Sequence, residues 1–99
     1  MKVSVSAFAR YRLFSIWKWV RDNSSRHNAD RLESRIMERV DGLARHPLKG
    51  PIEPALAFMD RGHRYLIHGR YKIIYRVEGA LVIVTDFFDT KQHPSRMRG

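Results

Sequence analysis

The sequence predicts an α+β protein in which two amphipathic helices come first and an antiparallel sheet follows. Apolar residues recur at helical spacing before residue 47, and at about every second position in the segments after residue 62. This order favours an antiparallel helical hairpin packed on one face of a three- to four-stranded antiparallel sheet, with a short strand at the N-terminus. The 99 residues suffice for one domain, residues 1–99, and are too few for two.

The first helix is predicted over Ala7–Arg21, after a short edge strand in Lys2–Ser6. One helical face collects apolar residues at spacings of four, three and four: Ala9, Leu13, Ile16 and Val20. A serine directly before such a pattern commonly caps the helix by accepting a backbone hydrogen bond. We therefore expect Ser6 to be the N-cap.

A second helix is predicted between Asn28 and the His46-Pro47 pair. Its apolar face is the clearest periodicity in the chain: Ala29, Leu32, Ile36, Val40 and Leu43. Asn28 is a suitable N-cap, and Asp30 would then lie in the first turn, where the helix dipole favours a negative charge. Proline disfavours the helical conformation in the residue before it, so the helix should end by His46.

Three strands are predicted in the second half of the chain, over His63–His68, Arg70–Val77 and Ala80–Phe88. In the middle strand, the side chains alternate between a face expected to join the core (Tyr71, Ile73, Tyr75, Val77) and a face expected to lie partly in water (Arg70, Lys72, Ile74, Arg76). Residues Ala55–Met59 fit either a strand or a turn of helix. The polar segment after Phe88 has no predicted element.

The composition points to a positively charged body without disulfides. The net charge is +9, and the excess is spread along the chain, with ten basic against five acidic residues before Pro47 and nine against five from there on. Such a body attracts nucleic acid or acidic proteins. The absence of cysteine excludes disulfides and cysteine-based zinc sites. No signal peptide or membrane span is visible, so we expect a cytoplasmic protein. We expect no metal and no cofactor.

Two segments together resemble the toxins of the RelE/ParE superfamily. Arg64–Val77 is similar to their central hairpin, with an aromatic residue, a glycine turn and a Tyr-Arg-Ile-Ile-Tyr-like phrase, and Val82–Pro94 is similar to their last strand and the polar phrase after it. Pro47–Gly50 matches the family's Pro-Leu-x-Gly. The resemblance implies a growth-inhibiting, plasmid-stabilising toxin of a type II toxin–antitoxin system, neutralised by a cognate antitoxin.

The superfamily carries two activities, and the residues favour one of them. RelE-like members cut mRNA on the ribosome, whereas ParE-like members inhibit DNA gyrase without a chemical step of their own. A metal-independent endoribonuclease would here have to use His63, Lys72, Lys91 and His93 for acid–base chemistry and charge stabilisation. The family's arginines are replaced by Lys72 and Lys91, and its tyrosine by Met97. We therefore favour gyrase inhibition, with ribosome-dependent mRNA cleavage as the alternative.

A target-binding surface is expected on the water-facing side of the sheet and the following tail. Its candidates are basic residues: Arg64, Arg70, Lys72, Arg76, Lys91, His93, Arg96 and Arg98. Carboxylates that neutralised this side of the sheet would overturn the hypothesis. A third possibility is a plain nucleic-acid binding module in which Tyr71 and Tyr75 stack on bases. Both tyrosines, however, lie on the same face of the predicted strand as Ile73, and this favours a place in the core.

The antitoxin is expected to bind along the first helix. Phe14 and Trp19, with Arg10 and Lys18 beside them, are the candidate contacts for an acidic segment that folds on binding. Trp17 borders the apolar face of the helix and is expected to pack within the hairpin instead.

Overall fold

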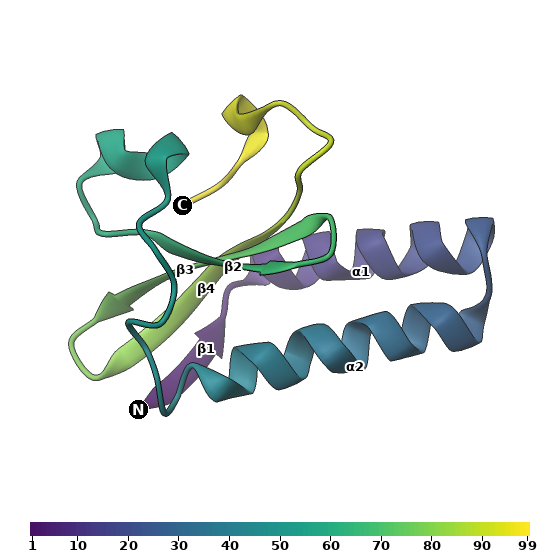
Figure 1. The fold of residues 1–99 in the computed structure, drawn as a ribbon, viewed down its shortest axis with the longest axis horizontal. Helices are drawn as coiled ribbons and strands as arrows, with labels where there is room; N and C mark the ends of the chain where they lie inside the picture. Colours follow the sequence, from purple (N-terminus) through teal and green to yellow (C-terminus); the bar gives the residue numbers. More distant parts are fainter.

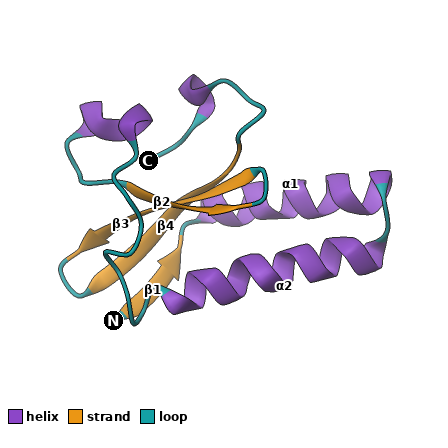
Figure 2. Cartoon of the chain, in the orientation of Figure 1, coloured by secondary structure: helices purple, strands orange, loops and turns teal.

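A computed structural model describes residues 1–99 and places a helical hairpin against one face of a four-stranded sheet (Figure 1). The elements in chain order are β1 (Lys2–Val5), α1 (Ala7–Asn23), α2 (Arg26–Gly42), the 3-10 helix η1 (Pro54–Met59), β2 (Arg64–His68), β3 (Tyr71–Glu78), β4 (Leu81–Asp89) and the 3-10 helix η2 (Pro94–Arg96). The two short 3-10 helices lie on the side of the sheet opposite the hairpin (Figure 2). The predicted α+β class and helical hairpin are confirmed.

The sheet is mixed rather than antiparallel, because the N-terminal strand pairs in parallel. The strand order is β1-β4-β3-β2, with β1 at one edge and β2 at the other. β4 is antiparallel to β3 but runs parallel to β1, where Val5 pairs with Val84. In the sequence, the helical hairpin separates β1 from the other three strands. The chain then returns to the sheet through β2 and β3, and β4 runs in the same direction as β1.

The start of α1 agrees with the prediction, and that of α2 does not. Ser6 caps α1, its Oγ accepting the backbone N–H of Ala9 at 3.0 Å. In α2 the cap is Ser25, whose Oγ accepts the backbone N–H of Asn28 at 3.0 Å, so the helix begins three residues earlier than the Asn28 cap implied. Asp30 therefore lies beyond the first turn, and it accepts a hydrogen bond from Trp17 Nε1 at 2.8 Å. That bond ties α1 to α2.

The connection from α2 to the sheet is held by a glycine packed against the backbone. Helix α2 ends at Gly42, ahead of the expected end at His46. The segment Ala55–Met59, which fitted either a strand or a turn of helix, lies in the 3-10 helix η1. Gly50 N–H donates to the hydroxyl of Tyr75 at 2.9 Å. A Cβ on Gly50 would lie 2.2 Å from the carbonyl oxygen of Tyr65, so only glycine fits there.

The main core lies between the hairpin and the sheet. It contains most of the apolar residues predicted for the two helices and for the core face of β3, with residues of β2 and β4: Ala9, Leu13, Ile16, Ile36, Val40, Leu43, Leu66, Tyr71, Ile73, Tyr75, Val82, Val84 and Phe87. Leu32 and Val77 are partly buried and pack against it. Burying this apolar surface drives the packing of the hairpin on the sheet. Tyr71 and Tyr75 of β3 are core residues, as predicted from the face of the strand on which they lie.

The opposite face of the sheet is covered over part of its area, contrary to the expectation of an open face. Leu56 from η1 and Met97 from the tail pack there on Ile74 and Phe88 in a second apolar cluster. Met97 is 6% exposed, so the tail is part of the packed structure. Figure 1 shows η1 and the C-terminal segment side by side over this face.

Candidate functional site

A bulge in β4 creates the site, because it interrupts the strand where β1 stops. Tyr75 pairs with Val84 and Ile74 with Asp86, so Thr85 is an extra residue without an opposite partner. β1 ends at Val5, beside Val84, and leaves the next residues of β4 without a neighbouring strand on that edge. The C-terminal tail and the first turns of α1 lie there instead.

A buried carboxylate joins the three segments at this place. Asp86 has no exposed surface; its Oδ2 accepts the backbone N–H of Arg98 at 2.9 Å, and its Oδ1 lies 3.2 Å from Nε of Arg12 on α1. Thr85 Oγ1 donates to the carbonyl of Arg98 at 3.1 Å, and Arg12 Nη2 donates to the carbonyl of Arg96 at 3.0 Å. Burial raises the pKa of Asp86, although these donors and cations oppose the shift.

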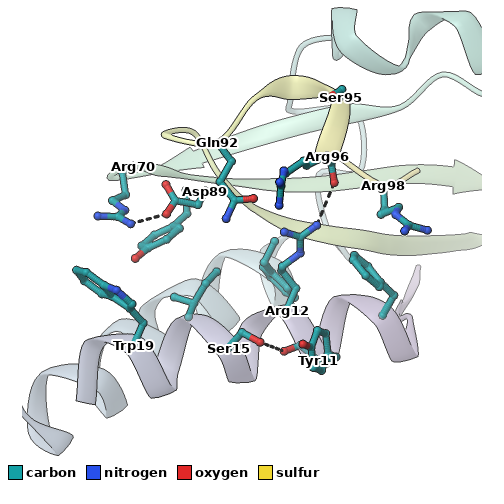
Figure 3. Close-up of a pocket in the computed structure, with 14 residues that line it drawn as sticks. Tyr11, Arg12, Ser15, Trp19, Arg70, Asp89, Gln92, Ser95, Arg96 and Arg98 are labelled. Carbon is teal, nitrogen blue, oxygen red and sulfur yellow. Dashed lines mark hydrogen bonds and ion pairs between the residues drawn. The ribbon is translucent and has the colours of Figure 1, made fainter. Parts of the chain in front are cut away.

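A cleft of about 670 Å³ opens between α1 and the tail (Figure 3). Its walls come from α1, from the ends of β3 and β4, and from the tail: Phe8, Tyr11, Arg12, Ser15, Ile16, Trp19, Arg70, Tyr71, Phe87, Asp89, Gln92, Ser95, Arg96 and Arg98. Tyr11 and Trp19 are more than half exposed on the helix wall. The volume falls within the usual range of ligand pockets.

The cleft combines aromatic rings with guanidinium groups. Arg70 is ion-paired with Asp89 and stacks on Trp19, with its guanidinium carbon 4.9 Å from the ring centroid. Arg98 lies over the ring of Phe8 at 5.1 Å. Neither Arg96 nor Arg98 has a carboxylate partner in the structure. Such a surface can receive an apolar or aromatic group together with a negative charge.

The cations predicted on the sheet are largely neutralised, which corrects the expected target-binding surface. Arg70 is paired with Asp89 and Arg76 with Glu78. Lys72 lies 2.9 Å from a carboxylate oxygen of the buried Glu53 and is placed over the ring of Tyr65. These pairs leave little free positive charge on the strands themselves.

Arg64 has a structural role in the same region. Its Nη1 donates to the carbonyl of Gly50 at 2.7 Å and so fixes the loop before η1. The members of the predicted set that remain exposed, without a carboxylate partner, lie in the tail: Lys91, His93, Arg96 and Arg98.

The four candidate residues for RNA cleavage do not form one constellation. His63, expected at an exposed strand end, is only 2% exposed and lies under the backbone of Gly99. Burial, followed by the charges of Arg76 and Arg61, lowers its pKa. Lys72 pairs with Ile67 on β2, and its Nζ lies over the ring of Tyr65, where Glu53 holds it.

The other two candidates lie in the tail. Lys91 and His93 are exposed, and His93 Nδ1 accepts the backbone N–H of Ser95 at 3.1 Å as the cap of η2. Met97, which replaces the family's tyrosine, is buried. The four candidate residues are therefore divided between the sheet and the tail, and Lys72 is engaged by Glu53.

The predicted antitoxin contacts remain accessible on α1. Phe14 and Trp19 are 55% and 52% exposed, and Arg10 and Lys18 are exposed as well. Trp17 is half-buried, as expected, and stacks on Phe14 with ring centroids 6.1 Å apart.

Three residues of the site were not predicted from the sequence. Asp86 is a carboxylate within an apolar strand, which is a recognisable signal because such a charge needs partners. Tyr11 and Arg12 lie on the polar side of the α1 pattern and carry no signal of their own. Their role depends on the tail, which is more than 70 residues away in the chain.

Comparisons with known proteins agree with this architecture. Residues 3–94 match the family model described as "ParE toxin of type II toxin-antitoxin system, parDE". A solved chain described as "Chromosomal ParDE TA system from P. aeruginosa" has a similar fold, with a TM-score of 0.77 and 19% identity over 90% of this chain and 95% of that one. No curated protein sequence matches.

The match over almost the whole chain shows the class of protein: a toxin of a type II toxin–antitoxin system, with a cognate antitoxin as its partner. Within that class, the chain belongs to the ParE toxin family. No helix is both long and apolar enough to cross a membrane.

Proposed function

We propose that this ParE-family toxin inhibits DNA gyrase in the cytoplasm and does so without a chemical step of its own. The observation that carries the proposal is the state of the candidate RNA-cleaving residues. His63 is buried with a lowered pKa, and Lys72 is held by Glu53. A general base must reach the proton that it removes, and a cation must be free to meet developing charge on phosphorus. Neither condition is met on the sheet.

The tail is the proposed gyrase-contacting surface. Lys91, His93 and Arg96 project from a segment that the Asp86 network holds against the body of the protein. A pre-ordered segment loses less conformational entropy on binding than a free one. Arg98, at the cleft, adds a further guanidinium without a carboxylate partner.

The antitoxin is proposed to bind across the exposed aromatic residues of α1, with Trp19 at the cleft and Phe14 beside Trp17. Phe14 and Trp19 supply large apolar surface, and Arg10 and Lys18 supply positive charge beside it. An amphipathic, acidic segment that orders on binding is complementary to both features. This placement leaves the tail on the other wall of the cleft, so an occupant of the cleft would also screen Arg96.

Two assays run in parallel test the proposed function. The toxin is added to a gyrase supercoiling and cleavage reaction, and separately to a translating extract whose mRNA is mapped by primer extension. We expect inhibited supercoiling or accumulated cleaved DNA with intact mRNA. Codon-positioned mRNA cuts with normal supercoiling would reject gyrase inhibition in favour of mRNA cleavage.

A matched pair of double variants tests the role of the tail. Lys91→Gln with Arg96→Gln removes two charges from the proposed contact surface, and Lys2→Gln with Arg61→Gln removes two exposed charges elsewhere. We expect the first pair to weaken inhibition of gyrase at least tenfold and the second to change it less than twofold. Equal effects would show that net charge, rather than the tail, determines inhibition.

A further inference from the structure

Three arginines share one side of helix α2. Arg31, Arg35 and Arg39 follow one another at intervals of four residues, so they share one side of the helix, with steps of about 6 Å along its axis. Glu38 lies on this side as well, beside Arg31 and Arg35, whereas Asp30 is engaged by Trp17 of α1. We call the side formed by Arg31, Arg35 and Arg39 the arginine flank.

The arginine flank keeps a net positive charge, because Glu38 is its one carboxylate against three guanidinium groups. None of its three guanidinium groups takes part in any of the six ion pairs of the structure. Arg31 and Arg35 are exposed. Arg39 Nη1 donates to the carbonyl of Ile67 at 2.6 Å and so connects the flank to β2, the edge strand of the sheet. The sheet cations, in contrast, are paired.

The electrostatic effect of the flank is felt at the end of β2. The pKa of His68 is lowered, first by partial burial and then by the charges of Arg39 and Arg35. Two cations thus raise the potential at a neighbouring strand end. A site of this kind attracts a polyanion.

The chemistry of the surface favours a phosphate backbone over a protein segment. A protein partner gains much of its affinity from aromatic and apolar anchors, and those are exposed on α1, at Tyr11, Phe14 and Trp19. Beside the arginine flank, Ile67 is the exposed large apolar side chain. Regularly spaced guanidinium groups with few apolar neighbours suit successive phosphates, which arginine binds through paired N–H groups.

We propose that the arginine flank of α2 binds the phosphate backbone of duplex DNA without reading its sequence. The choice of DNA rests on the proposed function, because gyrase holds duplex DNA that a bound toxin can reach. The contact itself needs no gyrase. It would add affinity for the gyrase–DNA complex over free gyrase, through release of counterions from the phosphates.

Salt-dependent binding measures the contact directly. Fluorescence anisotropy of labelled 20-base-pair duplexes of two unrelated sequences is recorded with the isolated toxin at several salt concentrations. The test variant is Arg31→Gln with Arg35→Gln, which leaves the Arg39–Ile67 hydrogen bond in place. The control is Lys2→Gln with Arg61→Gln, two exposed cations outside the proposed binding surfaces. Each phosphate contact contributes about 0.9 to the slope of log K against log salt, so the test variant should reduce the slope by about 2 and the control by less than 0.5.

The outcomes decide between the possible partners. Equal affinity for both DNA sequences, with the slope change confined to the arginine-flank variant, supports the proposal. Tighter binding of duplex RNA or of a glutamate-rich peptide than of DNA overturns it, as does an equal slope change in the two variants. DNA binding should also raise the pKa of His68, measured by NMR titration of toxin with ¹³C/¹⁵N-labelled histidine. An unchanged pKa would contradict contact at this flank. If the toxin binds DNA in this way but leaves supercoiling unaffected, the proposed gyrase inhibition is rejected and the proposed DNA contact is retained.

Discussion

Asp86 Oδ2 accepts the backbone N–H of Arg98 across 2.9 Å, and this bond holds the tail against the sheet. The carboxylate is fully buried and lies at the bulge of β4, where β1 no longer pairs. Its second oxygen faces Arg12 of α1. One side chain therefore sets the distance between the two walls of the cleft.

Removal of this carboxylate should loosen the tail. In Asp86→Ala, the N–H of Arg98 and the guanidinium of Arg12 lose their buried partner, which costs about 1–3 kcal/mol in the free energy of unfolding. Urea denaturation measures the loss, and limited trypsin digestion should cut after Arg96 and Arg98 faster than in the wild type. The control is Glu33→Ala, an exposed helical residue that should change stability by about 0.5 kcal/mol or less. Equal stability of Asp86→Ala and the wild type would contradict the role of Asp86.

The buried carboxylate should also leave a signature in the pH dependence of stability. Because the folded protein raises the pKa of Asp86, the native state binds its proton more readily than the unfolded chain does. The contribution of Asp86 to stability therefore increases as pH falls through that raised pKa towards the ordinary value of about 3.9. Glu78, whose pKa is lowered by its hydrogen bond from Arg76, acts with the opposite sign.

Comparison with Asp86→Asn isolates this effect, since all other groups titrate in both proteins. Denaturation at a series of pH values should show the wild type gaining stability over Asp86→Asn as the solution becomes more acidic. A difference that stays constant, or that shrinks in acid, would show that Asp86 is not shifted upwards.

Gly50 should tolerate no side chain. In Gly50→Ala the new Cβ would lie 2.2 Å from the carbonyl oxygen of Tyr65, so the loop must shift away from β2 and strain its hydrogen bond to the Tyr75 hydroxyl. We expect a loss of about 1–3 kcal/mol in thermal or urea unfolding. Gly42→Ala is the matched control, because a Cβ there meets no atom within 4 Å and helix propensity rises by up to about 1 kcal/mol. Equal effects of the two substitutions would exclude the close approach.

The fold was largely predictable because its strongest signals are local. The apolar spacing in α1 and α2, and the alternation in β3, each lie within one segment and follow directly from the geometry of a helix and a strand. The partner of β1 was not predictable in this way. Four weakly alternating residues do not show which strand they join, and parallel pairing with β4 is determined by the path of the chain through the hairpin.

The site was predictable only in part, because its charges are paired over long sequence separations. Lys72 and Glu53 are 19 residues apart, and nothing in either segment indicates that they meet. The burial of His63 depends on Gly99, which belongs to the polar tail. The exposed residues of α1 were predictable, since helical periodicity alone separates Trp19 from the core face.

Trp19 should prove to be an anchor for the antitoxin. The side chain is half exposed at the mouth of the cleft, and Arg70, itself tied to Asp89, holds it from one side. An aromatic ring held in this way presents apolar area at little further entropic cost, so truncation in Trp19→Ala should weaken antitoxin binding tenfold or more. Isothermal titration calorimetry with the purified antitoxin measures the change.

Phe58→Ala provides the comparison, because Phe58 is 81% exposed but lies on η1, on the opposite side of the sheet from the hairpin. Its removal should leave antitoxin affinity within twofold of the wild type. If the two variants lose affinity equally, the antitoxin wraps both sides of the toxin and α1 is not its principal contact. If only Phe58→Ala loses affinity, the antitoxin binds over η1 and the tail, and the aromatic side of α1 is left for the target.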